Sequence, residues 1–320
     1  MLLDIIYIIV GIALVLWGAD RMTDGAVSIA RRLRIPQIVI GLTIVALGTS
    51  MPELCISLIS ALKGTSDLAV GNVVGSNIFN TLLIVGVAAL VAPISILRST
   101  VTKDVPWSIF AGVLLIILCL DSKISRLDAL ILFAIFILFI AYNLWQAKKG
   151  KSEVSMEKAQ ENIPIWKSSF LVVLGLACLI FGSTLFVNSA TDVARALNVS
   201  DAVIGLTIVA GGTSLPELAT SAVAAKKGQS AIAIGNVLGS NVYNVLLILG
   251  LTGIVCPMET QDIHMADYGL MTLGMVLLWL FSFTRYKVER WEGAVLTIIF
   301  IAYMGWLIYN AVSPAAAVVQ

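Results

Sequence analysis

The sequence predicts an all-α polytopic membrane protein with ten transmembrane helices in two inverted-topology five-helix repeats. Three observations predict this class: the composition, the spacing of the apolar segments and an internal duplication. Of 320 residues, 59% are hydrophobic and 12% are charged, with a net charge of +1 and a mean hydropathy of +1.00. A soluble domain carries about 25% charged residues. The composition therefore excludes a soluble globular protein, a nucleic-acid binder with its basic stripe and a cysteine-dense disulfide scaffold.

Ten apolar segments are long enough to cross a bilayer, which takes about 20 apolar residues per helix. Their apolar residues are continuous and do not alternate with polar ones, as they would in a β-barrel. We therefore expect helices at about 2–18, 36–62, 67–92, 104–120, 127–146, 166–188, 200–225, 230–256, 267–284 and 291–312.

Lysine and arginine orient these spans, because cytoplasmic loops carry an excess of both. If the N-terminus is outside, 16 of the 20 lysines and arginines are cytoplasmic, and four remain outside: Lys63, Lys123, Arg126 and Arg195. This bias predicts both termini outside the cytoplasm. It also makes the polar stretch 147–165 a short cytoplasmic linker between a first repeat at 1–146 and a second at 166–320.

An internal duplication relates the two halves. The segment Gly41–Gly86 returns at Gly205–Gly250 with a constant offset of 164 residues, no gap and 29 identities in 46 positions. Five spans separate equivalent points, and an odd number means that the second copy inserts upside down. Inverted repeats with interrupted helices are a transporter architecture, with the substrate site at the repeat interface.

Two carboxylates occupy equivalent positions near the middle of their spans, Glu53 and Glu217. A charge at that depth costs at least about 2–3 kcal/mol unless something compensates it, so an intramembrane glutamate is a functional hypothesis by default. Pro52 and Pro216 precede them and free main-chain carbonyls from helical hydrogen bonds. The sequence therefore predicts a break in each span beside its carboxylate.

Further oxygen-bearing side chains share the helix faces of these carboxylates or recur in the next span. A single serine or threonine in a span usually bonds back to its own helix, and only the doubled pattern raises these residues above that interpretation. Hard cations such as Ca²⁺ and Na⁺ prefer oxygen ligands of this kind. The residues are Thr49 and Thr213, Ser50 and Ser214, Ser76 and Ser240, and Asn80 and Asn244.

At these residues the sequence resembles the sodium/calcium exchanger family, within the calcium/cation antiporter superfamily. The first repeat reads GTSMPE and then GSNIFN, and the second reads GTSLPE and then GSNVYN. The resemblance implies a core of spans 2, 3, 7 and 8 and exchange of Ca²⁺ for Na⁺ by alternating access in a prokaryotic inner membrane. It implies no enzymatic activity, cofactor, nucleic acid or obligate protein partner, and only the lipid bilayer and the two ions as partners.

The resemblance also implies a role for each matching residue. Glu53 and Glu217 would bind both ions, and Thr49 and Thr213 would complete the calcium site. Asn80 and Asn244 would close the central position. The flanking sodium sites would be formed by Ser50, Ser76, Ser214 and Ser240 with the carbonyls of Ala46 and Ala210.

One position departs from part of the family, because potassium-dependent members have aspartate where this chain has Asn244. With two formal negative charges, from Glu53 and Glu217, the predicted ion site balances one Ca²⁺ or two Na⁺, which disfavours K⁺ co-transport. The main alternative is an H⁺/Ca²⁺ antiporter in which Glu53 and Glu217 exchange protons. An ion channel and an intramembrane protease that uses two acids are further alternatives from other classes.

Overall fold

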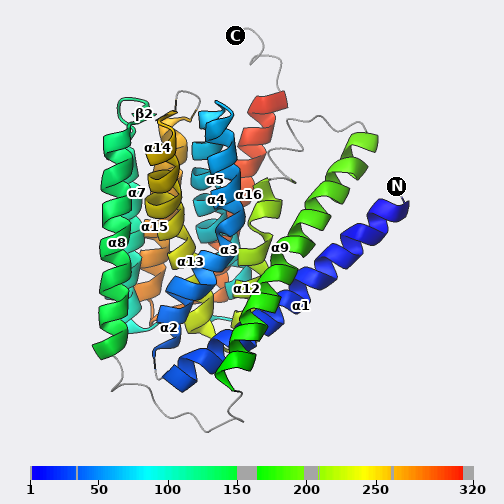
Figure 1. Ribbon diagram of the computed structural model, residues 1–320, viewed down its shortest axis with the longest axis vertical. Helices are drawn as coiled ribbons and strands as arrows, with labels where there is room; N and C mark the ends of the chain where they lie inside the picture. The colour runs from blue at the N-terminus through cyan, green and yellow to red at the C-terminus, as the bar shows by residue number, and fades with distance from the viewer. Residues whose placement is uncertain are drawn as a thin grey trace.

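The computed structural model is a bundle of long helices (Figure 1). It describes residues 2–33, 35–149, 164–197, 208, 210–260 and 263–312. Within these residues, eight helices are long and apolar enough to cross a membrane, and a further span, Gln37–Thr49 with Met51–Leu62, is bent by 45°. The all-helical membrane fold predicted from the sequence is confirmed. The seventh expected span, 200–225, and the predicted linker, 147–165, lie partly outside the described residues.

The elements of the first repeat follow the predicted order of spans. They are α1 (Leu2–Leu33), α2 (Gln37–Ile40), η1 (Gly41–Val45), α3 (Ala46–Thr49), α4 (Met51–Leu62), α5 (Ser66–Ile78), η2 (Phe79–Ile84), α6 (Val85–Val91), β1 (Ile94–Ser95), η3 (Thr100–Asp104), α7 (Val105–Leu118), β2 (Lys123–Ile124) and α8 (Arg126–Lys149), where η marks a π-helical segment.

The described elements of the second repeat occur in the same order. They are α9 (Ile165–Ala196), α11 (Ala210–Thr213), α12 (Leu215–Lys226), α13 (Ser230–Val242), η6 (Tyr243–Leu249), α14 (Gly250–Val255), β3 (Met258–Glu259), α15 (Met265–Phe283), β4 (Lys287–Val288) and α16 (Arg290–Val312).

The long helices α1 and α9 cross side by side in opposite directions (Figure 1). Both exceed the expected spans, 2–18 and 166–188, and continue to Leu33 and Ala196. The additional turns of α1 stay helical because one face packs on α9, while Asp20, Arg21 and Asp24 occupy other positions. Hydropathy alone places the ends of these helices too early, because it registers the polar residues on one face and not the packing of the other face.

The contacts between the repeats are reciprocal at the offset of 164 residues. A Cβ atom on Gly18 would lie 2.7 Å from the Gly175 oxygen, and one on Gly182 would lie 2.8 Å from the Gly11 oxygen. Gly18 and Gly182 are equivalent positions, as are Gly11 and Gly175. Gly18 therefore contacts the counterpart of Gly11, and Gly11 contacts the counterpart of Gly18. This reciprocity is the mark of a two-fold relation.

The short strands pair in the same reciprocal way. Strand β1 pairs antiparallel with β4, with Ile94 opposite Val288, and β2 pairs antiparallel with β3, with Ile124 opposite Met258. Adding 164 to 94 gives 258, and adding 164 to 124 gives 288, so one pair maps onto the other. The duplication therefore relates the two halves as far as these strand pairs, beyond the repeated motif itself.

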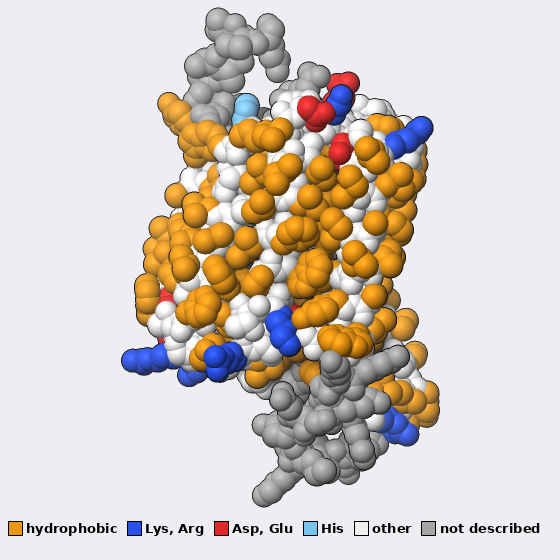
Figure 2. Space-filling model, turned by 90° about the vertical axis from the view of Figure 1, so that its left-hand side faces the viewer, with side chains coloured by type: hydrophobic (Ala, Val, Ile, Leu, Met, Phe, Trp, Pro, Cys, Tyr) orange, Lys and Arg blue, Asp and Glu red, His pale blue; other side chains and the backbone are white. Residues whose placement is uncertain are grey.

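The two spans that contain the GSN motifs form the centre of the bundle. In the most apolar 18-residue stretch of Ser230–Val255, 94% of the residues are buried, and in that of Ser66–Val91 72% are buried. The share is 22–33% in the other six unbroken spans that the structure describes. Small residues permit the closest approach: a Cβ atom on Gly239 would lie 2.6 Å from the Ala46 Cβ and 2.9 Å from the Leu42 Cα. The outer helices present a broad hydrophobic band, with charged side chains gathered at its two ends (Figure 2).

An ion-pair cluster joins α1 to the turn between α12 and α13. The Lys227 Nζ lies 2.7 Å from the Asp20 Oδ1 and 2.7 Å from the Asp24 Oδ1, and it donates to the Asp20 main-chain oxygen at 3.1 Å. The equivalent positions in α9, 164 residues later, are Thr184 and Asn188. The cluster therefore breaks the two-fold relation at one end of the molecule.

The crossing of α1 and α9 predicts a packing defect in Gly175→Ala. The new Cβ would lie 2.6 Å from the Gly18 oxygen and 2.7 Å from the Met22 nitrogen, so the two backbones must separate. Overpacking of this kind costs about 1–3 kcal/mol. We expect a lower midpoint of thermal unfolding in detergent. Gly305→Ala in α16 is the control, because no described atom lies within 4 Å of its Cβ, and equal midpoints for the two variants would contradict this packing.

Candidate functional site

Helix breaks place both intramembrane carboxylates at the start of a half-helix. Ser50, with φ −84° and ψ 6°, separates α3 from α4, and Glu53 lies in the first turn of α4. Ser214, with φ −90° and ψ 7°, separates α11 from α12, and Glu217 lies in the first turn of α12. The prolines are tolerated because the first turn has no helical acceptor for their missing N–H. The positive end of each half-helix thus faces a carboxylate.

The two carboxylates lie in the middle of the bundle and are each 1% exposed. The Ser50 hydroxyl donates to the Glu217 Oε1 at 3.3 Å, which joins the first repeat to the second. The equivalent serine, Ser214, instead donates to the Ser76 Oγ at 3.4 Å. The same motif thus makes different bonds in the two halves.

Six buried oxygen atoms on the predicted site residues have no hydrogen-bond partner within the described part of the chain. They are both carboxylate oxygens of Glu53, the Glu217 Oε2, the Asn80 Oδ1, the Asn244 Oδ1 and the Ser240 Oγ. Buried polar atoms are nearly always paired, since leaving one unpaired costs free energy. Carboxylate, amide and hydroxyl oxygens are the kind of ligand that a hard cation such as Ca²⁺ takes.

The Thr49 hydroxyl is surrounded by hydrogen-bond acceptors. It is fully buried, and its Oγ1 lies 3.0 Å from the Asn236 Oδ1, 3.2 Å from the Val45 oxygen and 3.4 Å from the Ala46 oxygen. All three atoms are acceptors, so the single hydroxyl proton points toward this group of oxygens. The lone pairs of Thr49 therefore remain available for a cation.

The remaining predicted residues are placed as follows. Ser76, Asn80, Ser214, Ser240 and Asn244 are all 5% exposed or less, and Thr213 is partly buried. The Ala46 carbonyl accepts the Ser50 N–H at 3.0 Å and lies 3.4 Å from the Thr49 Oγ1. Ala210 begins α11. The site combines two carboxylates with neutral oxygens, and the described residues contain no cluster of three or more His, Cys, Asp or Glu side chains.

Two asparagines that the sequence analysis missed brace the half-helices. The Asn72 Nδ2 donates to the Glu53 main-chain oxygen at 3.2 Å and to the Ser57 Oγ at 3.0 Å. The Asn236 Nδ2 does the same at 3.4 Å to the Glu217 oxygen and at 3.0 Å to the Ser221 Oγ. Both belong to a repeated Gly-Asn dipeptide, Gly71-Asn72 and Gly235-Asn236, and an identical polar residue in both repeats was the signal that could have found them.

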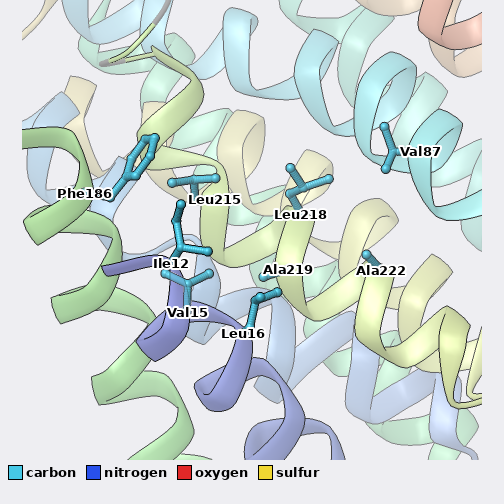
Figure 3. A pocket seen from close by; sticks show the side chains of 9 residues that line it. All are labelled: Ile12, Val15, Leu16, Val87, Phe186, Leu215, Leu218, Ala219 and Ala222. Carbon is cyan, nitrogen blue, oxygen red and sulfur yellow. The ribbon is translucent and has the colours of Figure 1, made fainter. Parts of the chain in front are cut away.

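Two cavities of about 190 Å³ each lie beside the broken helices. One is partly polar and reaches the residues next to Glu53 and Ser214; it is lined by Pro52, Ile56, Ser183, Thr184, Val187, Asn188, Gly212 and Thr213. The other is lined only by apolar side chains from α1, α6, α9 and α12, including Ile12, Phe186 and Leu218 (Figure 3). Only the polar cavity offers oxygen atoms to an ion.

Comparison with known proteins finds one family along most of the chain. The model of the family described as "Sodium/calcium exchanger protein" matches residues 3–145 and 167–309. CaxA of Alkalimonas amylolytica is 37% identical, over 97% of this chain and all of its own length. The inner membrane protein YrbG of Escherichia coli (strain K12) is 34% identical, over 96% of this chain and 98% of its own.

A solved structure has the same fold. The sodium-calcium exchanger NCX_Mj, in crystals soaked with Na⁺ and Sr²⁺, superposes with a TM-score of 0.84 at 29% identity, covering 95% of this chain and 98% of its own. The agreement extends over both repeats, because the match includes nearly the whole of each chain.

The unpaired oxygens predict that Glu53→Gln or Glu217→Gln abolishes high-affinity calcium binding without unfolding the protein. Each change removes one of two negative charges and keeps the side-chain shape, and a neutral amide is cheaper to bury than a carboxylate. We expect the calcium affinity in a radiolabel binding assay to fall by about a hundredfold or more, which is about 2.7 kcal/mol.

Glu292→Gln is the matched control for this loss. Glu292 is also fully buried with one unpaired oxygen, but its Oε2 caps α16 by accepting the Glu289 N–H at 2.8 Å. We expect calcium binding to be unchanged in this variant. Equal losses in all three variants, or normal binding in either Glu53 or Glu217 variant, would rule out the two-carboxylate site.

Proposed function

The chain belongs to the sodium/calcium exchanger family, and on that premise we propose that it exchanges Ca²⁺ for Na⁺ across a membrane through the site around Glu53 and Glu217. The single observation that carries the residue assignment is the set of six buried, unpaired oxygen atoms on the predicted site residues. The family is one of membrane transporters, so the ions are substrates and undergo no chemical reaction.

Charge balance explains how one site can couple two ions. Glu53 and Glu217 together carry two negative charges, which match one Ca²⁺ or two Na⁺. Because either load neutralises the site, the two ions exclude one another. The empty, doubly charged site is costly in the bilayer, which disfavours its crossing without an ion. This coupling is the basis of the proposed exchange.

The proposed ligand roles are those that the resemblance to the sodium/calcium exchanger family implies. Glu53 and Glu217 bind both ions, Thr49 and Thr213 complete the calcium site, and Asn80 and Asn244 close the centre. Sodium, with its single charge, is held in flanking positions by hydroxyl and carbonyl oxygens. These come from Ser50, Ser76, Ser214 and Ser240 with the carbonyls of Ala46 and Ala210.

Access from alternate sides is supported by the asymmetry between the halves. The polar cavity is lined by Ser183, Thr184 and Asn188 of α9 and reaches the site beside Pro52 and Thr213. At the equivalent place on α1, Asp20 and Asp24 are bound by Lys227. We infer that one passage is open where the polar cavity lies and that its counterpart is closed by the ion-pair cluster. If the two repeats swapped these arrangements, the site would open to the other side of the membrane, and the bound ions would be carried across.

We further propose a prokaryotic inner membrane as the location, with both termini outside the cytoplasm. Support comes from the excess of lysine and arginine in the expected cytoplasmic loops. It also comes from the relative YrbG, which is an inner membrane protein. The division into repeats at 1–146 and 166–320 around a linker at 147–165 belongs to the same proposal, with the bilayer and the two ions as the only partners.

The decisive experiment is calcium uptake into proteoliposomes loaded with Na⁺. An outward sodium gradient should drive uptake of labelled Ca²⁺, and collapsing that gradient should stop it. Uptake driven by a proton gradient and not by sodium would replace this proposal with an H⁺/Ca²⁺ antiporter. Single-channel currents in a planar bilayer would replace it with a channel.

Replacing Asn244 by aspartate is expected to raise the apparent affinity for cations. Asn244→Asp adds a third carboxylate to a site that holds two, at a position that is 1% exposed. Transport assays over a range of Ca²⁺ should show a lower KM, and K⁺ should become able to compete or to be carried. A variant with wild-type ion dependence would place Asn244 away from the ions.

A further inference from the structure

We propose that Asn77 is a positioning residue, which holds the Asn244 amide with its oxygen toward the ions. The proposal rests on the proposed function and deepens the same site. Asn77 is not among the expected ligands. It belongs to α5 of the first repeat, whereas Asn244 belongs to η6 of the second.

The two amides meet in the buried centre of the bundle. Asn77 is 0% exposed and Asn244 is 1% exposed, so water does not satisfy their polar atoms. The Asn244 Nδ2 donates to the Asn77 Oδ1 at 3.0 Å. This bond crosses the repeat interface beside the ion site.

A main-chain atom determines which way both amides face. The Asn77 Nδ2 donates to the Asn241 main-chain oxygen at 3.2 Å and contacts the Met271 Sδ at 3.6 Å. A carbonyl oxygen can only accept, so the NH₂ end of Asn77 must face it and the oxygen end must face Asn244. Asn244 must then present its own NH₂ to Asn77. The orientation of the first amide therefore dictates that of the second.

The free end of Asn244 is consequently an oxygen. The Asn244 Oδ1 is buried and has no hydrogen-bond partner within the described residues. An amide oxygen is a calcium ligand, whereas an NH₂ group in the same place would repel a cation. Without Asn77, the Asn244 side chain could rotate by half a turn and present its NH₂ group to the ions. Asn77 thus acts on the ions only through Asn244.

The two-fold relation does not duplicate this arrangement. Asn241 is the counterpart of Asn77, but its Nδ2 donates to the Thr81 Oγ1 at 2.8 Å, and its Oδ1 accepts no hydrogen bond from a described residue. The second repeat has Val245 where the first has Thr81. Asn244 is therefore the amide that this network orients. A carboxylate at position 244 could not donate to Asn77, so the neutral residue at 244 and Asn77 are matched.

The test is the Ca²⁺ dependence of uptake into Na⁺-loaded proteoliposomes, with KM and maximal rate measured separately. We expect Asn77→Ala to raise KM about tenfold, the equivalent of about 1.4 kcal/mol, and to reduce the maximal rate less. Asn244→Ala should raise KM at least as much. In the double variant, removal of Asn77 should add nothing, because the residue it orients is absent.

Two further variants separate orientation from folding. Asn143→Ala removes an equally buried amide, which donates to the Phe139 oxygen within α8, and should leave KM unchanged. Asn77→Leu keeps a side chain of similar size without either amide end, and it should raise KM as Asn77→Ala does. It replaces Asn77→Ala as the test if the alanine variant does not fold.

Three results would overturn the inference: a wild-type KM in Asn77→Ala, effects that add in the double variant, or a wild-type KM in Asn77→Leu. Its failure is distinguishable from failure of the proposed function. If wild-type protein takes up no Ca²⁺ under a sodium gradient, the exchange itself is wrong. If wild-type uptake is normal and Asn77→Ala leaves KM unaltered, only the role of Asn77 is wrong.

Discussion

Two carboxylates buried in the middle of a membrane protein are the constraint on which the rest of the structure depends. Glu53 and Glu217 are each 1% exposed, and isolated charges at that depth are costly. The structure compensates them with half-helix starts, with a serine hydroxyl on Glu217 and with positions for a cation. The broken spans are needed for this, because an unbroken helix would present neither a free N-terminal turn nor unpaired main-chain groups.

The two-fold relation accounts for the architecture, and departures from it determine the side from which the site is open. Reciprocal glycine contacts and strand pairs run through both halves. At the site, however, Ser50 bonds Glu217 whereas Ser214 bonds Ser76. At the helix ends, Lys227 binds two aspartates of α1, whose counterparts on α9 are uncharged and line the polar cavity. Two equal halves in unequal arrangements are what alternating access requires, since exchanging the arrangements reverses the open side.

Asparagines brace or orient the groups that we propose bind the ions. Asn72 and Asn236 donate to the main-chain oxygens of Glu53 and Glu217, and Asn236 also accepts from Thr49. The Asn77 Oδ1 accepts from the Asn244 Nδ2, and we propose that this bond orients the Asn244 amide. An amide suits this work because it has a donor end and an acceptor end and carries no charge. The network can therefore direct hydroxyl protons and amide oxygens without changing the charge balance of the site.

The sequence by itself determined the helical class, most span positions, the duplication and the set of polar side chains at the centre. It could do so because the hydrocarbon core demands long apolar helices and makes each buried charge conspicuous. Only the tertiary structure decided the full length of α1 and α9, which depends on packing between them. It alone also decided which serine bonds Glu217 and how Asn77 faces Asn244. Identical motifs carry the same local information in both repeats, whereas hydrogen bonds across the interface depend on how the two copies pack together.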